Sequence, residues 1–236
     1  MALAHFLTVR GPAAAAERLA GWFHDGPAAA LAGLGGVDYL DLYTPSRTDH
    51  TDPYVEDRDG PALMIQTGHA DLAAVAAMLT SPAFAAAADL AASGVPGLRA
   101  THDVMRQEFF AVAGEDAPRP MSAPLSFVVR YHGPCEDPAL FTRHYREGHA
   151  TGLARLPAVR NVLVYARADW DDPTGIARAD YLLGNEVVFD SIDALNAALN
   201  SPARHEMREH VATFPGWSGH NTHYAMDRAR LAAKRR

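Results

Sequence analysis

Cysteine is almost absent from this chain, which has one, Cys135, among 236 residues. A single cysteine excludes a disulfide framework and any zinc site built from several cysteines. No stretch approaches the roughly 18 apolar residues of a membrane helix, and the N-terminus lacks the basic region and long apolar run of a secretory signal. We therefore expect a cytoplasmic protein that does not bind membranes.

Positive charge is also scarce, because 28 acidic residues outnumber 21 Lys and Arg and leave a net charge of −7 with His neutral. A chain of this charge is not expected to bind nucleic acid. Its most basic stretch, residues 228–236, is short and terminal, and we interpret it as a solvated helix end. The hydrophobic content of 48% is ample for a buried core.

Several motifs that would identify a chemistry are missing as well. The sequence has no GxGxxG, GxxxxGK[ST], GxSxG or HExxH motif, so dinucleotide binding, phosphate-loop, serine-esterase and zinc-protease signatures are all absent. The acidic loop 48–57 lacks the Gly and Glu positions of a calcium-binding EF-hand loop. We therefore expect neither a metal ion nor an organic cofactor.

What the chain does contain is an internal repeat. Leu7-Thr8-Val9-Arg10 aligns with Phe127-Val128-Val129-Arg130, and Leu79-Thr80-Ser81-Pro82-Ala83 aligns with Leu199-Asn200-Ser201-Pro202-Ala203. Both pairs have the same offset of 120 residues, and the order of the matches is preserved along the chain. We interpret this pattern as a divergent duplication.

Each repeat has the pattern strand, helix, strand, strand, helix, strand. Apolar alternation predicts strands near 3–10, 37–43, 62–68 and 102–110, and again near 125–131, 159–167, 181–189 and 220–226. Helical spacing, Pro at first turns and Ser caps predict helices near 13–33, 70–79, 82–92, 138–155, 191–199 and 202–211. The helix at 202–211 carries alternating charges and is expected to be a solvated face.

This order is the ferredoxin-like arrangement, an α+β fold in which helices cover only one face of an antiparallel sheet. Two such sheets that face each other would cover both open faces. The sequence therefore predicts tandem ferredoxin-like repeats, 1–112 and 124–228, joined by a linker at 113–123 and forming an intrachain barrel. Because the chain supplies both sheets, it can be a monomer or a homodimer.

A family resemblance supports this fold. The run Phe141-x-x-His144-Tyr145-x-x-x-His149-x-x-x-Leu153-x-x-Leu156-Pro157-x-Val159-Arg160 resembles the EthD-like family of dimeric α/β-barrel proteins. Ala158 replaces a usual Gly, Ala150 replaces a frequent Pro, and Pro27 stands at the position of His149 in the first repeat. The resemblance implies small, often acidic substrates held between a sheet and helices, usually without a cofactor, although haem-binding members exist.

His149 is the first candidate catalytic residue. It shares a helix face with Phe141, Tyr145 and Leu153, and that face is expected to lie against the sheet. A partly buried His there would have a pKa near neutrality, which suits general acid–base catalysis. The alternative is a packed histidine bonded to the backbone.

Two further candidates lie in the unusually polar strand His220-Asn221-Thr222-His223-Tyr224. Alternation places His220 and His223 on opposite faces. We expect either or both to line a pocket and assist catalysis. Because His223 aligns with His102 of the first repeat, a shared structural hydrogen bond remains the alternative for it.

Substrate binding is assigned to residues near the strand ends. Arg130 and Arg10 occupy the same place in their repeats, where each could bind a carboxylate bidentately or form an ion pair with a neighbouring strand. Tyr131 ends its strand beside a pocket mouth, and Tyr165 could donate to an oxyanion or simply pack in the core. Trp217 is either a loop anchor or a pocket wall.

These features and the resemblance imply a cofactor-independent enzyme with His-based acid–base chemistry. We expect a small anionic substrate, an unsaturated carboxylate from bacterial aromatic (lignin-type) catabolism. The reaction would be methyl-ester hydrolysis or double-bond isomerisation of a ring-cleavage product. The alternatives are a non-catalytic barrel protein that binds a small ligand or haem, and a cofactor-free oxygenase.

Overall fold

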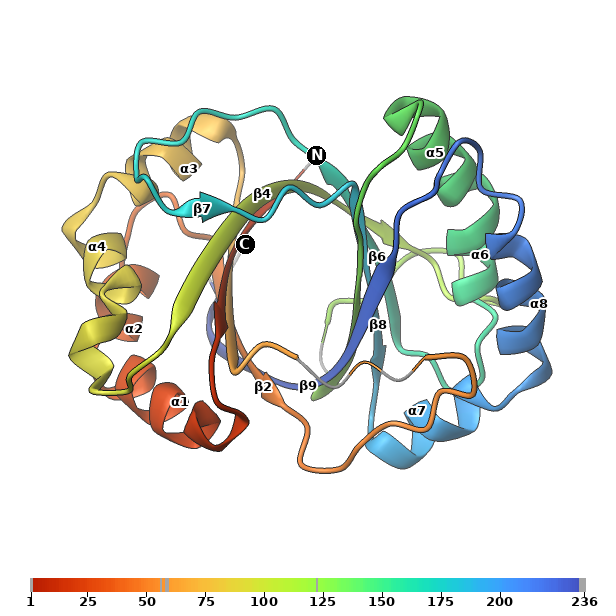
Figure 1. Cartoon of the computed structure of the whole chain (residues 1–236), viewed down its shortest axis with the longest axis horizontal. Helices are drawn as coiled ribbons and strands as arrows, with labels where there is room; N and C mark the ends of the chain where they lie inside the picture. Colours follow the sequence, from red (N-terminus) through yellow and green to blue (C-terminus); the bar gives the residue numbers. More distant parts are fainter. Residues whose placement is uncertain (1, 56, 58–59, 122, 234–236) are drawn as a thin grey trace.

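The computed structural model describes residues 2–55, 57, 60–121 and 123–233. These residues form a closed barrel of eight long strands with helices on two opposite sides (Figure 1). The strands are β1 (Ala2–Arg10), β2 (Tyr39–Pro45), β3 (Leu63–His69), β4 (Arg99–Phe110), β5 (Leu125–Tyr131), β6 (Asn161–Arg167), β8 (Leu183–Phe189) and β9 (Asn221–Ala233). A two-residue strand, β7 (Ala177–Arg178), pairs with β4 in parallel.

The two halves of the chain have the same strand order. In the first half the order is β4-β1-β3-β2, and in the second it is β9-β5-β8-β6. The pairs β2–β9 and β4–β6 join the halves and close the ring. The predicted α+β fold with two ferredoxin-like sheets in one barrel is thus confirmed, whereas the duplication and the limits 1–112, 113–123 and 124–228 stay predictions.

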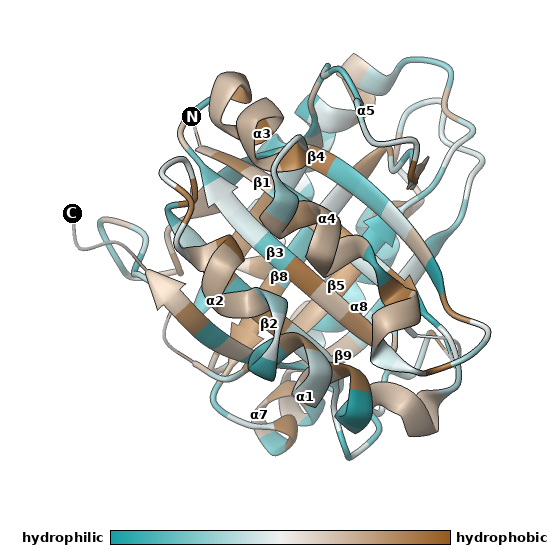
Figure 2. Ribbon diagram, turned by 90° about the vertical axis from the view of Figure 1, so that its left-hand side faces the viewer, coloured by the Kyte–Doolittle hydropathy of each residue, from teal (hydrophilic) through white to brown (hydrophobic). Residues whose placement is uncertain are grey.

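Each half carries its helices on the outer face of its own four strands. The first half has α1 (Ala16–Asp25), α2 (Pro27–Ala32), α3 (Leu72–Leu79) and α4 (Pro82–Ala88), and the second has α5 (Pro138–His144), α6 (Ala150–Leu153), α7 (Ile192–Leu199) and α8 (Pro202–Val211). Figure 2 looks onto the first half, where hydrophobic stretches appear on the helices and on the strands beneath them. In the described part of the chain no helix is long and apolar enough to span a membrane.

Strand alternation separates the core into an outer and an inner part. On β5, Leu125, Phe127, Val129 and Tyr131 face the helices, whereas Val128 faces the inside of the barrel. The inside also contains polar groups that satisfy one another. The fully buried carboxyl group of Glu186 accepts hydrogen bonds from Ser126 at 2.5 Å and from Tyr165 at 2.7 Å, as buried polar groups generally do.

The basic C-terminal stretch differs from its prediction. It continues β9 as far as Ala233, and residues 234–236 lie outside the described residues. Arg228 is buried and lies 3.3 Å from Asp41 of β2, and Arg230 binds the same carboxylate. The predicted solvated helix end is therefore wrong, because pairing with a strand of the other half extends β9 beyond its local pattern.

Two loops cross between the halves. The loop between β2 and β3 reaches the second half, where Asp52 accepts a hydrogen bond from Arg204 of α8 at 2.7 Å. The loop between β6 and β8 reaches the first half, where Asp172 lies 3.0 Å from His102 of β4. Figure 1 shows the first loop (orange) passing near α7 and the second (turquoise) passing near α3. Each half is therefore completed by a segment of the other.

Candidate functional site

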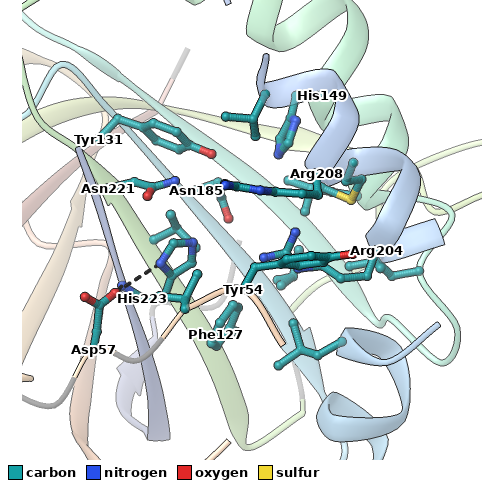
Figure 3. Close-up of a pocket in the computed structure, with 18 residues that line it drawn as sticks. Tyr54, Asp57, Phe127, Tyr131, His149, Asn185, Arg204, Arg208, Asn221 and His223 are labelled. Carbon is teal, nitrogen blue, oxygen red and sulfur yellow. Dashed lines mark hydrogen bonds and ion pairs between the residues drawn. The ribbon is translucent and has the colours of Figure 1, made fainter. Parts of the chain in front are cut away.

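A pocket of about 240 Å³ lies between the strands and the helices of the second half (Figure 3). Its floor is the outer face of β5, β8 and β9, and its roof is the helical segment around His149 together with α8. The crossing loop of the first half contributes Tyr54, Val55 and Asp57 to the rim. The pocket therefore contains residues from both halves.

The strand register arranges the floor of the pocket. Val129 of β5 pairs with Asn185 of β8 on one side and with His223 of β9 on the other. These three residues thus form a row across neighbouring strands, each about 4.8 Å from the next. Asn185 and His223 consequently stand about 10 Å apart with an apolar residue between them.

A π-helical turn, η3 (Tyr145–His149), positions the histidine of the roof. Such turns are frequent at functional sites because they alter the direction of side chains within a helix. His149 is 4% exposed, and its ring points into the pocket. A Cβ on Gly148 would lie 2.3 Å from His210 Nε2, so the glycine lets His210 of α8 approach this turn.

The environment of His149 keeps its imidazole neutral. Burial, together with the positive charge of the nearby His210 and Arg204, lowers the pKa of His149 to about 3. The predicted pKa near neutrality is therefore wrong, and a neutral imidazole acts here as one donor and one acceptor. Its buried Nδ1 has no hydrogen-bond partner among the described residues, so it is not the backbone-bonded histidine of the alternative reading.

His223 is oriented by a carboxylate from the crossing loop. Asp57 Oδ2 accepts a hydrogen bond from the His223 backbone at 2.7 Å and lies 3.1 Å from His223 Nδ1. Burial raises the pKa of Asp57, but the hydrogen bonds from the ring and backbone of His223 outweigh it and hold the pKa below its usual value. The ionised carboxylate favours a proton on Nδ1 and leaves Nε2 to accept one.

Two phenols and two amides lie beside this row. Asn185 Nδ2 donates to the Tyr145 hydroxyl at 2.5 Å, and the ring centre of Tyr131 lies 5.2 Å from that of Tyr145. Asn221 of β9 pairs with Tyr131 of β5. Burial raises the pKa of both tyrosines, so both phenols stay protonated. Asn185 Oδ1 is buried and has no partner among the described residues.

Two arginines of α8 lie at the rim. The guanidinium of Arg204 forms a buried ion pair with Asp52, with contacts of 2.7 to 3.2 Å. Arg208 lies over the Tyr54 ring at 5.6 Å and extends across the pocket in Figure 3. Within the described part of the chain it has no carboxylate in ion-pair distance, so its positive charge remains available to a ligand.

Three of the predicted substrate-binding residues lie elsewhere. Arg130 and Tyr165 point into the barrel, where the Arg130 guanidinium stacks on Phe6 at 4.6 Å and on Tyr165 at 5.4 Å. Arg10 also lies away from the pocket, where it donates to the Tyr224 hydroxyl at 3.1 Å. Because successive residues of a strand face opposite sides, Tyr131 lines the pocket and Arg130 cannot.

Of the other predicted site residues, some line the pocket and some lie outside it. His149, His223 and Tyr131 come together in the pocket, whereas His220 stacks on His132 with ring centres 4.2 Å apart. Trp217 donates to the His132 carbonyl at 2.9 Å and packs behind Tyr131. Trp217 thus anchors a loop in this structure and does not line the pocket.

Sequence reasoning missed most residues of the pocket, among them four polar ones that matter for its chemistry. Asn185 interrupts a buried strand, and this polarity was a usable signal. Arg204 shares a helical stripe with Met207 and Val211 at i, i+3 and i+7, which predicts one buried side of α8, whereas His205 and Arg208 are exposed as expected. Asp57 had no local signal, because its role depends on contact with the other half.

A metal ion held by protein side chains is not indicated by these residues. Among the described residues no three His, Cys, Asp or Glu side chains are grouped to hold a metal ion.

Comparisons with known proteins support the fold. Residues 134–215 match the family model of the EthD domain. Over 98% of the chain, the structure is similar to an anthrone oxidase-like protein (93% of that chain, 12% identity, TM-score 0.61). It is also similar to proposed monooxygenases from Lactobacillus acidophilus (98% of this chain, 99% of that one, 7% identity, TM-score 0.56) and Fusobacterium nucleatum (99% and 95%, 11% identity, TM-score 0.55).

No curated protein sequence matches the chain. The expected isomerase or methyl-ester hydrolase of aromatic catabolism is contradicted, because the similar structures are named as monooxygenases and an anthrone oxidase-like protein. The geometry agrees with this correction. The arginine expected to hold a carboxylate, Arg130, lies on the other side of the sheet from His149 and His223.

Proposed function

Because the second half of the chain carries an EthD domain within a dimeric α/β-barrel fold, we propose that this protein is an oxidoreductase, a cofactor-free oxygenase. Its substrate is a small aromatic molecule with an acidic C–H group. The observation that carries the proposal is the His223–Asp57 pair in the wall of a pocket that has both apolar and polar lining residues. A base in such a place can make a substrate carbanion that reacts with O₂ directly.

The reaction begins with a proton transfer. His223 Nε2 accepts a proton from a methylene carbon of the substrate, and ionised Asp57 stabilises the resulting imidazolium. The carbanion transfers an electron to O₂, the two radicals combine, and the peroxide that forms loses water. One CH₂ group and one O₂ thus become one C=O group and one H₂O, so the reaction needs no external reductant.

Other pocket residues suit this chemistry. Val129, Val187 and Leu153 exclude water and offer the apolar surroundings in which O₂ dissolves well. Arg208 lies at the rim with an unshared positive charge and can stabilise the anion that forms after proton loss. The anion is thus formed from the substrate during the reaction, whereas the substrate itself was expected from the sequence to be anionic.

The names of structural relatives agree with the proposed reaction. Two are proposed monooxygenases and one is an anthrone oxidase-like protein. At 7 to 12% identity the likeness concerns the fold, so the argument for the reaction rests on the pocket.

Oxygen consumption tests the proposal. Anthrone, a tricyclic ketone with an acidic methylene group, is the probe, and an oxygen electrode records the rate with the purified protein. We expect His223→Gln to lower the rate by about 10²- to 10⁴-fold, the usual contribution of general acid–base catalysis. His24→Gln is the control, because His24 lies exposed on α1 of the other half. Equal rates for the wild type and His223→Gln would refute the proposal.

A further inference from the structure

Two buried polar atoms of the pocket have no partner among the described residues. They are His149 Nδ1 and Asn185 Oδ1, and their residues are 4% and 1% exposed. Buried polar atoms in folded proteins are nearly always hydrogen-bonded, so two unpaired atoms in one pocket indicate that a ligand completes them. Figure 3 shows His149, Asn185 and Tyr131 around the same end of the pocket.

The surrounding network sets the direction of the hydrogen bonds at this end. The Asn185 amide uses its Nδ2 to donate to Tyr145, which leaves Oδ1 as an acceptor. Tyr131 lines the same pocket, and its hydroxyl can donate a hydrogen bond. The pocket thus offers an acceptor on Asn185 and a donor on Tyr131.

We propose that this end of the pocket binds the un-ionised hydroxyl group of an elongated, hydroxylated aromatic ligand. The ligand hydroxyl donates to Asn185 Oδ1 and accepts a hydrogen bond from Tyr131, while His149 contacts the same oxygen or a neighbouring polar substituent. This inference adds the ligand class to the proposed oxygenase function. It rests on that function in one respect, namely that the end of the ligand that reacts lies at His223.

Charge complementarity argues against a carboxylate in this position. A carboxylate would place negative oxygens against the lone pairs of Asn185 Oδ1. The nearest imidazole, His149, is neutral and brings no compensating charge. An unpaired buried charge is strongly unfavourable, whereas a hydroxyl satisfies both an acceptor and a donor.

The shape of the pocket limits the size of the ligand. A cavity of about 150 Å³ is enough to hold benzene, so 240 Å³ has room for fused rings with small substituents. The row on the floor runs about 10 Å from Asn185 to His223, over Val129. A flat ligand can therefore hold its hydroxyl at Asn185 and place a distant ring position next to His223.

Binding measurements without oxygen test the inference independently of turnover. Isothermal titration calorimetry under nitrogen compares 1-naphthol, 1-methoxynaphthalene and 1-naphthoate, which share the rings and differ in the polar group. We expect wild-type protein to bind 1-naphthol about tenfold more tightly than the methyl ether, since the ether cannot donate a hydrogen bond. The naphthoate is expected to bind more weakly than 1-naphthol.

The variant Asn185→Leu is expected to lose the preference for 1-naphthol. Leucine suits this position, because Leu63 holds the corresponding place of β3 in the first half, opposite Val9. His223→Gln is expected to keep the preference even when it abolishes oxygen consumption. Equal affinities for naphthol and its ether in the wild type, or tighter binding of naphthoate, would overturn the inference. Loss of the His223 effect on turnover would instead refute the oxygenase, so the two failures are distinguishable.

Discussion

The ion pair between Asp52 and Arg204 holds the crossing loop of the first half over the pocket of the second. Asp52 is fully buried and the Arg204 side chain is 11% exposed. The same loop carries Asp57, which orients His223. Replacement of Asp52 by alanine should therefore affect both the stability of the fold and the catalytic base, even though Asp52 does not touch the ligand.

The size of the effect follows from burial. In Asp52→Ala the guanidinium of Arg204 loses both oxygens that it contacts at 2.7 to 3.2 Å and, among the described residues, keeps the Tyr54 ring at 5.0 Å. Removal of one partner of a buried ion pair costs about 3–5 kcal/mol, because the remaining charge is buried without compensation. The double variant Asp52→Ala with Arg204→Met removes both charges and should recover most of that loss.

Urea denaturation of the wild type, both single variants and the double variant gives the coupling free energy. Hydrogen exchange of residues 46–55 then reports whether the loop detaches locally. A detached loop would limit the loss of global stability and would expose the pocket. The reasoning is refuted if Asp52→Ala is as stable as the wild type and its loop exchanges no faster. It is also refuted if the double variant is less stable than Asp52→Ala.

Two further predictions concern stability. His149 has a pKa of about 3 in the folded protein and about 6.5 when unfolded, so stability is full above pH 6.5 and falls as the pH decreases through this window. Between pH 7 and 5 this residue lowers the free energy of unfolding by about 2 kcal/mol. Urea denaturation of His149→Gln at both pH values should therefore show a change in that free energy smaller than the wild type's by this amount. An equal change in the two proteins contradicts the burial argument. Gly68→Ala places a methyl group 1.9 Å from the Tyr39 ring and should cost about 1–3 kcal/mol, measured as a lower melting temperature. Gly35→Ala, where an added methyl meets no atom within 4 Å, is the control, and equal melting temperatures for the two variants would count against the predicted clash.

Local sequence patterns predicted the elements of the fold well. The strand predicted at 125–131 and the helix predicted at 202–211 have the observed bounds, because alternation, caps and prolines act over a few residues. The helical stripe also placed His149 toward the sheet correctly. Strand alternation could have separated Arg130 from Tyr131, because adjacent residues of a strand face opposite sides of the sheet.

Long-range contacts decided the rest of the site. Asp57 belongs to a loop of one half and acts on His223 of the other, and no local pattern contains that contact. The pKa of His149 could not be predicted, because it depends on how completely His210, Arg204 and the sheet bury the ring. The length of β9 likewise depends on β2, its partner from the opposite half.

By itself, then, the sequence determined the two ferredoxin-like halves, the closed barrel and the helix face that carries His149. The halves and the helix face follow from periodicity and capping, which are interactions between near neighbours in the chain, and the barrel follows from the need to cover the open face of each sheet. The tertiary structure decided which loop covers the pocket, which carboxylate orients His223, and which buried polar atoms have no partner among the described residues. Each of these depends on residues far apart in sequence that meet only when the barrel closes.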